Sequence, residues 1–367
     1  MTDKLFADHP ISHPKDDAFG LSTFADALAT SLLKMSPADG LVISVEGPWG
    51  SGKSSAIALT TRTIKLRVLI GLGEGQDELE KLTNEELDEK WEEKAKARNT
   101  HIVRFNPWNF SGQENLVRAF FGELAAQLRV ESDNKFRRMW DRTVNSMPDL
   151  GQVAATGGAL LSGSGAIAAA AGGLGRALGE AGQKAFGVDK SIEGAKKKLA
   201  KALRASDQRI IVIIDDLDRL MPSEMRSVFS LVKSLGDLPN VLYVLSFDDS
   251  VVQKALQDSA ERIDPAFLEK IVQVSLKLPP PWREELRRLF FKRLNAIIGD
   301  AKIADQSRWE EMFTTVIEPY LSTPRDVTRL ANTLQVIWPN VVGDVEIADM
   351  IAITTLQLFD ADVYNLV

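Results

Sequence analysis

Five short apolar stretches recur along the first three quarters of the chain. A stretch that is apolar at every position is typical of a strand buried on both faces, as in a parallel sheet that helices cover on both sides. With helices expected between these strands, the pattern predicts an α/β fold of three layers. The predicted strands are residues 41–45, 101–106, 210–214, 241–249 and a last one within 267–278.

From residue 282 onward the apolar positions recur with a helical period, after three consecutive prolines have ended the last predicted strand. Thr323 is expected to cap a helix that begins at Pro324, because Thr is favoured at the N-cap and Pro at the first helical position. Arg325 falls in the first turn of this helix. The other helices of this region are expected over 282–298, 308–321 and 345–359.

These patterns predict three parts of the chain. Residues 1–40 form an N-terminal segment, 41–281 an α/β core and 282–367 a helical C-terminal domain. Within the core we expect surface insertions at about 74–98 and 150–205. The first insertion is rich in acidic residues with interspersed lysines and shows no strong apolar stripe, which is typical of a solvated helix or a surface insertion.

The second insertion contains an uncharged run, mostly Ala, Gly and Ser, over residues 150–175. One membrane crossing here would separate strands that must join one sheet, and two crossings of about 20 residues each do not fit. We therefore expect no transmembrane span; a short hairpin, a small-residue packing surface and a disordered segment remain open. The basic amphipathic stretch 196–204 is expected to pack on the sheet, and a peripheral contact with anionic lipid or nucleic acid is the less favoured alternative.

The composition of the chain limits its chemistry. Of its 367 residues, 44% are hydrophobic and 26% charged, as in folded soluble proteins, and the formal net charge of −7 argues against broad, sequence-independent nucleic-acid binding. The absence of cysteine excludes disulfides, thiol catalysis and cysteine-ligated metals, and the three histidines are scattered. The N-terminus lacks the apolar core of a secretory signal, so a cytoplasmic location is expected.

A glycine-rich loop follows the first predicted strand and precedes a helical stretch over 55–69. Its sequence fits G-x-x-x-x-G-K-[ST] in the strand–loop–helix context that the pattern requires. The loop amides and the helix N-terminus would cradle phosphates, Lys53 would reach the β- and γ-phosphates, and the Ser54 hydroxyl would ligate Mg²⁺. The predicted nucleotide-binding residues are Gly47, Pro48, Trp49, Gly50, Ser51, Gly52, Lys53, Ser54 and Ser55.

Carboxylates follow the predicted strand at 210–214. Because ligands bind beyond the carboxyl ends of parallel strands, Asp215 would emerge beside the phosphates and hold Mg²⁺, mostly through water. Asp216 suits a base or an orienting group for the attacking water, and Asp218 would instead fix a neighbouring loop. The plain alternative is that these acids only cap a turn.

The nucleotide is predicted from strand position. The strand at 101–106 lies in sequence between the phosphate loop and the acidic strand. Such an intervening strand is typical of ATPases with an added acidic catalytic residue. No Asn-Lys-x-Asp sequence for reading guanine is present, so ATP is the expected nucleotide. At the end of the strand 241–249, Ser246 or Asp248 would sense the γ-phosphate, or simply satisfy the strand terminus.

Five segments together resemble the KAP family of P-loop NTPases, which looks related to the AAA+ and STAND ATPases. The resemblance spans residues 16–364, and a tryptophan within the phosphate loop combined with an Asn-Pro-Trp segment makes it specific. It implies a sheet of strand order 5-1-4-3-2 and a helical lid. The segments are 47–54, 105–108, 215–219, 268–271 and 324–327.

The resemblance also implies roles for single residues. Arg325 falls where a lid arginine would contact the γ-phosphate, with a salt bridge to the strand layer as the alternative. Lys270 or Arg262 falls near the place of a finger that acts on a neighbouring subunit, and residues 16–20 would touch the adenine. Many family members carry paired transmembrane helices where residues 150–175 stand, but this run is too short and too rich in glycine for such a pair.

Together the motifs predict an Mg²⁺-dependent ATPase that couples ATP binding and hydrolysis to conformational change. Its catalytic residues would be Lys53, Asp216 and Arg325, with Ser54 and Asp215 at the metal. The family includes bacterial and plasmid proteins implicated in excluding phage, so the resemblance implies anti-phage defence or plasmid-encoded interference, with a protein partner or a homo-oligomer. The alternative is a nucleotide-gated signalling scaffold with slow hydrolysis, in one form at a membrane surface; a membrane-perturbing effector and a small-molecule kinase are more distant.

Overall fold

The computed structural model describes most of the chain on either side of residues 128–196, and the described residues fall into two compact units. The sheet unit comprises Ala25–Glu46 and Thr60–Lys277, and the loop unit comprises Met1–Phe24, Gly47–Leu59 and Leu278–Val367. Residues 150–175 and Arg262 lie outside the described part. The described residues are 5–35, 39–95, 97–110, 119–120, 123–124, 127, 197, 200–201, 203–205, 208–257, 266–299, 301, 303 and 305–366.

The sheet unit contains a five-stranded sheet in which all neighbouring strands are parallel. Its order is β2-β3-β4-β1-β5, which reads 5-1-4-3-2 from the β5 edge, so the predicted α/β fold and strand order are confirmed. The strands are β1 (Leu41–Glu46), β2 (Thr100–Phe105), β3 (Arg209–Ile214), β4 (Val241–Phe247) and β5 (Val274–Lys277).

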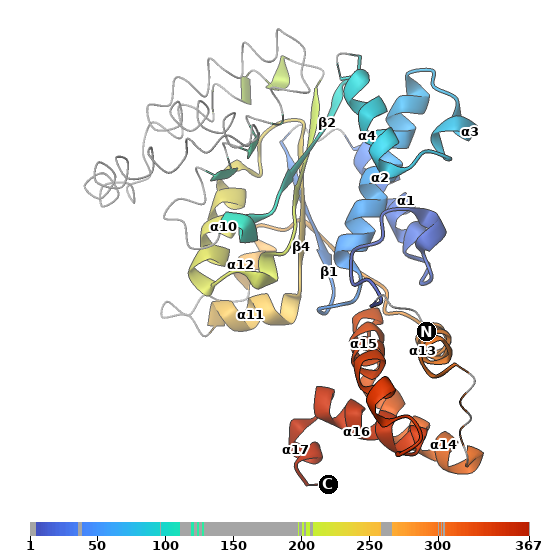
Figure 1. Cartoon of the computed structure of the whole chain (residues 1–367). Helices are drawn as coiled ribbons and strands as arrows, with labels where there is room; N and C mark the ends of the chain where they lie inside the picture. The colour runs from blue at the N-terminus through green and yellow to red at the C-terminus, as the bar shows by residue number, and fades with distance from the viewer. Residues whose placement is uncertain are drawn as a thin grey trace, which may run out of the picture. The chain divides into compact units, whose positions relative to one another are not determined.

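Helices cover both faces of this sheet and give the unit its three layers (Figure 1). On one face α10 (Pro222–Leu235), α11 (Asp249–Gln257) and α12 (Ala266–Glu269) pack on an apolar cluster that includes Phe229 and Tyr243. On the other face lie the parts of α1 (Leu21–Lys34) and α2 (Lys53–Gly71) that belong to the sheet unit, with buried residues Leu28, Leu32 and Ile64. Burying each such side chain stabilises the fold by about 1.5–3 kcal/mol, which is why the central strands β3 and β4 are apolar at nearly every position.

The parallel order brings the carboxyl ends of the strands to one edge of the sheet. Glu46 of β1 lies opposite Phe247 of β4, and Ile214 of β3 lies opposite Leu245. Because β4 stands between β1 and β3, their ends are two strand spacings apart, roughly 10 Å. The glycine loop that follows β1 and the acids that follow β3 therefore both start from this edge.

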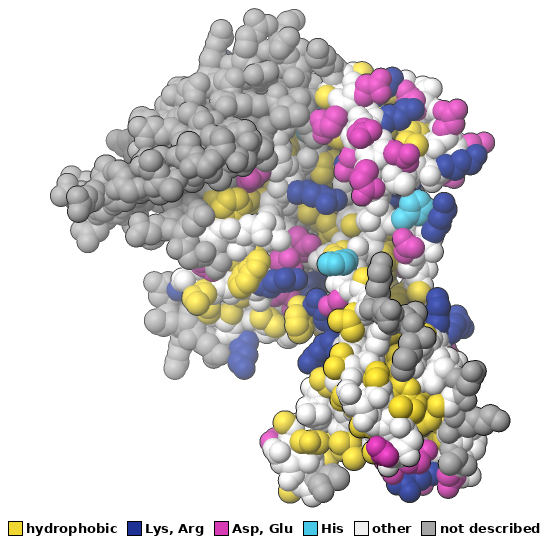
Figure 2. Space-filling model, viewed as in Figure 1, with side chains coloured by type: hydrophobic (Ala, Val, Ile, Leu, Met, Phe, Trp, Pro, Cys, Tyr) yellow, Lys and Arg dark blue, Asp and Glu magenta, His cyan; other side chains and the backbone are white. Residues whose placement is uncertain are grey.

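The acid-rich stretch 74–98 forms two short helices, α3 (Gln76–Leu79) and α4 (Asn84–Glu93), and α4 begins with a capping box between Thr83 and Glu86. Figure 2 shows acidic side chains gathered over these helices. The expectation of no strong apolar stripe is wrong in one respect, because Leu79, Leu87 and Trp91 are buried.

Trp91 anchors the insertion through cations as well as through apolar contact. The Arg98 guanidinium lies 3.8 Å and the Lys65 ammonium 5.8 Å from the centre of a Trp91 ring. Hydrogen bonds from Lys90 and then Lys94 hold the pKa of the half-buried Glu74 carboxyl at about 2. The insertion is therefore a packed part of the sheet unit with a charged outer surface.

The loop unit contains the C-terminal helices, which share an apolar core around Phe290, Ile317 and Leu334. The predicted helix over 308–321 is instead three pieces: α14 (Gln306–Met312), a π turn over Phe313–Ile317 and a 3₁₀ turn over Glu318–Tyr320. Pro319 explains the break, since it lacks an N–H donor and its ring clashes with the preceding turn. The other helices are α13 (Arg283–Ile298), α15 (Pro324–Val341), α16 (Ile347–Phe359) and α17 (Ala361–Tyr364).

Candidate functional site

The glycine loop leaves β1 after Glu46 and ends where α2 begins at Lys53. Gly50 and Gly52 have φ values of +84° and +99°, a region of backbone conformation that side chains with a Cβ rarely adopt. These two residues turn the backbone back onto the N-terminus of α2. The spacing of glycines in the motif is thus required by the path of the chain.

The loop encloses the amine of Lys53. This side chain is only 8% exposed, and its Nζ donates hydrogen bonds to the carbonyl oxygens of Gly47, at 2.8 Å, and of Pro48, at 3.3 Å. A buried ammonium at a helix N-terminus adds its charge to the positive end of the helix dipole. Lys53 and the first turn of α2 therefore form a site suited to an anion.

The N-terminus of α15 packs directly against this loop within the loop unit. A Cβ at Gly50 would lie 2.8 Å from Cβ of Arg325 and 2.9 Å from Oγ1 of Thr323, which is closer than carbon atoms tolerate. Thr323 caps α15 as predicted, since its Oγ1 accepts a hydrogen bond from the Asp326 amide. Gly50 is consequently required both for its φ and for this close approach.

Arg325 lies between the loop and the N-terminal segment. Its guanidinium carbon is 4.4 Å from the centre of a ring of Trp49, whose side chain is 57% exposed. Arg325 also contacts the N-terminal segment, because its Nε forms an ion pair of 2.7 Å with the Asp8 carboxylate. The alternative of a salt bridge from Arg325 to the strand layer is thus replaced by a salt bridge to Asp8.

The N-terminal segment is tied to the start of α2 and organises the start of α1. The backbone N–H of Ile11 donates to Oγ of Ser55, at 3.1 Å. The Asp17 carboxylate accepts hydrogen bonds from the amides of Phe19, Leu21 and Ser22. Burial raises the pKa of Asp17, but these hydrogen bonds, those from Ser22 first, outweigh it and leave the pKa below its ordinary value. The predicted contact of residues 16–20 with adenine stays a prediction.

The acidic residues follow β3 in the sheet unit, at its carboxyl edge. Asp216 has a φ of +60°, uncommon for a residue with a side chain, and it starts a 3₁₀ turn over Leu217–Arg219. Its amide donates to the Asp215 carboxylate, at 2.9 Å. The tight turn holds the two carboxyl groups next to each other.

Two neighbours hold the Asp216 carboxylate. Nδ2 of Asn106 donates to one oxygen, at 3.2 Å, and Nε of Arg219 pairs with the other, at 2.8 Å. Burial, and then the charge of Asp215, raise the pKa of Asp216, and the Arg219 cation and the Asn106 hydrogen bond lower it by less. A carboxylate with a raised pKa is a stronger base than an ordinary aspartate, which suits proton abstraction from water.

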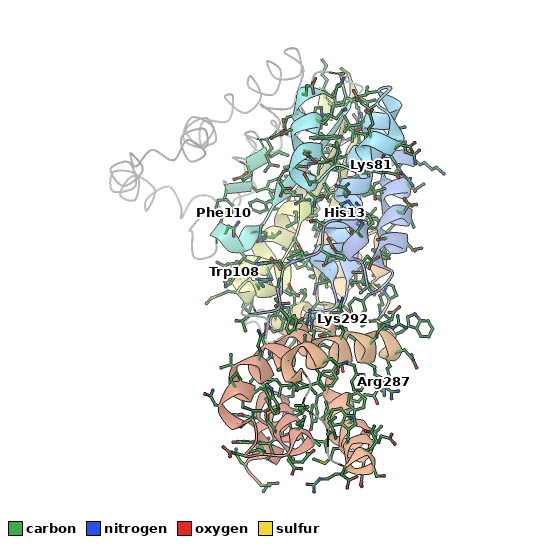
Figure 3. All side chains as sticks on the ribbon, turned by 45° about the vertical axis from the view of Figure 1, so that its right-hand side comes forward. His13, Lys81, Trp108, Phe110, Arg287 and Lys292 are labelled. Carbon is green, nitrogen blue, oxygen red and sulfur yellow. The ribbon has the colours of Figure 1, made fainter. Side chains whose placement is uncertain are left out.

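Asn106 and Arg219 contact the predicted base, Asp216, and the sequence motifs left both without a role. Asn106 follows β2, the strand that neighbours β3, and its side-chain oxygen accepts a hydrogen bond from the Trp108 amide, at 3.0 Å. Trp108 and Phe110 both belong to the 3₁₀ turn over Pro107–Phe110 (Figure 3). A polar residue at the carboxyl end of the strand adjoining the acidic one is the signal that sequence offers for Asn106.

Asp218 and Asp248, the other acidic residues at this edge, accept hydrogen bonds from neighbouring residues. The Asp218 carboxylate accepts a hydrogen bond from the Asp248 amide, at 3.1 Å, so the expectation that Asp218 fixes a neighbouring loop is confirmed. The Asp248 carboxylate in turn accepts from the amide and the hydroxyl of Ser250 at the start of α11. Ser246 is fully buried and its hydroxyl has no hydrogen-bond partner within the described residues.

The oxygens required for Mg²⁺ are present in the two units. Oδ1 of Asp215 accepts from the Asp216 amide, and the structure records no hydrogen bond, within the described ranges, at its other oxygen or at the Ser54 hydroxyl. Carboxylate and hydroxyl oxygens are the donors that Mg²⁺ prefers, together with phosphate oxygens and water. Each of these two residues, taken within its own unit, therefore has donor chemistry that fits the ion that the motif implies.

Three further predictions concern Lys270, the basic stretch 196–204 and membrane crossing, and the described residues bear on each only in part. Lys270 is exposed in the turn after α12, which leaves its role as a finger a prediction. Leu203, from the basic stretch 196–204, is fully buried in the core of the sheet unit, in line with its expected packing. None of the helices built from described residues has both the length and the hydropathy to cross a bilayer.

Comparison with known proteins points to one family. The chain matches the family model of the KAP family P-loop domain over residues 21–341. It is 25% identical to the phage T7 exclusion protein of Escherichia coli (strain K12), over 98% of this chain and 47% of that protein, so the chain spans about half the length of this relative.

Solved structures give fainter likenesses. The Aeropyrum pernix ORC1 protein in complex with DNA matches with a TM-score of 0.41 and 12% identity, over 95% of this chain and 66% of that chain. Domain III of the Thermotoga maritima replication initiation protein DnaA matches with a TM-score of 0.36 and 15% identity, over 96% of this chain and 99% of that one.

Proposed function

Because the chain belongs to the KAP family of P-loop domains, we propose that it is an Mg²⁺-dependent ATPase that couples ATP binding and hydrolysis to a conformational change. The observation that carries the proposal is the phosphate loop. Gly50 and Gly52 bend the backbone around the buried amine of Lys53 at the N-terminus of α2. Such a loop binds phosphates through its amides, its lysine and the helix dipole together.

Each half of the site has a role in this proposal. Lys53 binds the β- and γ-phosphates, and Ser54 and Asp215 are the protein ligands for Mg²⁺, which when bound neutralises charge on the phosphates. Asp216 accepts the proton of the attacking water. The ends of β1 and β3 share one edge, roughly 10 Å apart, which supports the proposal that one magnesium–triphosphate is gripped from both.

Arg325 and residues 282–367 would act as the lid. An arginine beside a phosphate loop stabilises the charge that develops on the transferred phosphoryl group. Its contact with Trp49 keeps the guanidinium at the loop. Closure of the lid on ATP, and its release after hydrolysis, would be the conformational output.

The name of one relative supports a proposal for the biological role. A protein named for phage exclusion resembles this chain over 98% of its residues. We therefore propose a role in anti-phage defence or plasmid-encoded interference, in the cytoplasm, together with a protein partner or further copies of the chain. Loss of phage resistance in cells carrying Lys53→Ala would test this role directly.

Steady-state hydrolysis tests the enzymatic proposal. The purified chain with Mg²⁺ is expected to release phosphate from ATP, and Lys53→Ala and Asp216→Ala are each expected to abolish release. Lys292→Ala, which removes an exposed lysine from α13 (Figure 3), is the matched control and is expected to leave the rate unchanged. Turnover that persists in Asp216→Ala would remove that residue as the base.

A second candidate is a nucleotide-gated switch that hydrolyses slowly. The ion pair between Arg219 and Asp216 favours it, because the Arg219 cation lowers the pKa of Asp216 in part and so makes it a weaker base than it would be without this partner. Nucleotide-dependent assembly with negligible phosphate release would support the switch. Rapid release without assembly would support the enzyme.

A further inference from the structure

The N-terminal segment over residues 5–20 places the Asp8 carboxylate against Arg325, which lies in the first turn of the lid helix α15. Asp8 pairs with Arg325 at 2.7 Å, and the same guanidinium lies over Trp49 of the phosphate loop. We propose that this N-terminal segment is a strap that nucleotide displaces: Asp8 is an internal anion for Arg325, and the terminal phosphate of ATP takes its place. The inference rests on the proposed function, since it requires a triphosphate at the loop.

The charges around Asp8 support a site where anions exchange. Arg293 of α13 lies over Phe6, 4.9 Å from its ring centre, and donates a hydrogen bond of 2.5 Å to Thr328. Burial lowers the pKa of Arg293, and the charge of Asp8 raises it in part. Asp8 therefore stands in the field of two guanidinium groups.

A phosphate group can displace Asp8 from its ion pair with Arg325. The Asp8 side chain is 45% exposed and carries one charge, and partly exposed carboxylate pairs are weak. A terminal phosphate carries more charge and pairs with arginine through two parallel hydrogen bonds. Trp49 would hold Arg325 beside the loop during this exchange, because its contact does not depend on which anion is bound.

Two anchors bracket Asp8 along the strap. On one side Phe6 and Asn332 of α15 form two hydrogen bonds, of 2.8 and 3.0 Å. On the other side the Ile11 amide donates to Ser55 of α2. The strap thus links the lid helix to the helix that follows the phosphate loop, and loss of the central ion pair would loosen this link.

Hydrogen exchange on the full chain tests release of the strap. With Mg²⁺ and a non-hydrolysable ATP analogue, the amides of Phe6 and Ile11, whose hydrogen bonds anchor the strap, are expected to exchange at least about 5-fold faster than without nucleotide. ADP is expected to cause no such change, because it lacks the terminal phosphate. Protection that stays equal in all three states would overturn the strap.

Binding affinity tests the exchange of anions. Asp8→Asn removes the internal competitor and is expected to bind the ATP analogue about 3- to 10-fold more tightly, with ADP affinity unchanged. Asp344→Asn, a matched loss of charge at the far end of α15, is expected to change neither affinity. Equal affinity of Asp8→Asn and the unaltered chain for the analogue would overturn the inference and leave the proposed function standing.

A double substitution assigns the effect to the ion pair. In the background of Arg325→Ala, Asp8→Asn is expected to give no further change, whereas in the background of Arg329→Ala the gain should persist. Arg329 lies one turn along α15 and contacts Phe359 instead of the loop, so it is a matched control. A gain that persists without Arg325 would refute the pairing, and failure of the unaltered chain to bind any nucleotide would overturn the proposed function as well.

Discussion

The acidic cluster of the sheet unit and the phosphate loop of the loop unit, which carry the predicted site residues, are built in different ways. On the acidic side, Asn106, Asp216 and Arg219 come from neighbouring strand ends and one short turn of the sheet unit. On the loop side, Asp8, Trp49 and Arg325 are far apart in sequence and meet only through packing of the N-terminal segment and the C-terminal helices. The acidic side is thus fixed by the sheet, and the loop side is where movement of other parts of the chain can alter the site.

The largest effect is expected from Asp216→Asn, which tests the acidic side. Loss of the base should lower the turnover number about 10²- to 10⁴-fold with little change in ATP affinity. Because the folded-state pKa of Asp216 is raised, its ionisation at neutral pH opposes folding. The neutral Asn should therefore leave the thermal midpoint no lower, and a large drop in that midpoint would show a structural role instead.

A smaller effect, on binding, is expected from Gly50→Ala on the loop side. The added Cβ meets a positive φ and the start of α15, so ATP affinity should fall about 10- to 100-fold. Gly343→Ala is the matched control, since its φ of +91° imposes the same strain with no neighbour within 4 Å. If both variants bind ATP equally well, the close approach of α15 to the loop does not contribute to ATP binding.

Asn106→Ala is expected to act less strongly and on the acidic side alone. It removes a hydrogen bond that orients the Asp216 carboxylate, so turnover should fall about 10-fold while the affinity for ATP stays the same. Measured turnover and affinity that fall together would place Asn106 at the nucleotide itself.

The smallest effect is expected from Arg219→Ala. The Arg219 cation lowers the pKa of Asp216, so its removal should move the acid limb of the pH–rate profile to higher pH. Above that limb the freed carboxylate should raise the rate a few-fold if the ion pair restrains the base. If the acid limb of the pH–rate profile does not move, that limb does not report the ionisation of Asp216.

Sequence patterns were enough for the sheet, because β1, β2, β3 and β4 are buried at almost every position and short apolar runs of that length are typical of buried strands. They also indicated that Asp218 fixes a neighbouring loop, as its hydrogen bond from the Asp248 amide shows, although they did not identify that partner. They failed at two single residues. Pro319 breaks a predicted helix, and Trp91 is buried with the Arg98 and Lys65 cations over its ring, in a stretch where no apolar stripe was expected.

The partner of Arg325 shows a different limit. Nothing near Arg325 in sequence points to Asp8, because the pair is created by the path of the N-terminal segment across α15. Patterns along the chain predict which groups gather at a strand edge; they do not predict which distant loop supplies a counter-charge.

The place where α15 begins has a mechanical consequence. This helix has 18 residues and is therefore about 27 Å long, with its first turn seated on the glycine loop. A tilt of about 10° at that pivot would carry its far end by about 5 Å. A phosphate bound at the glycine loop would thus shift the far end of α15 and the helix α16 that packs on it, without any change in the sheet.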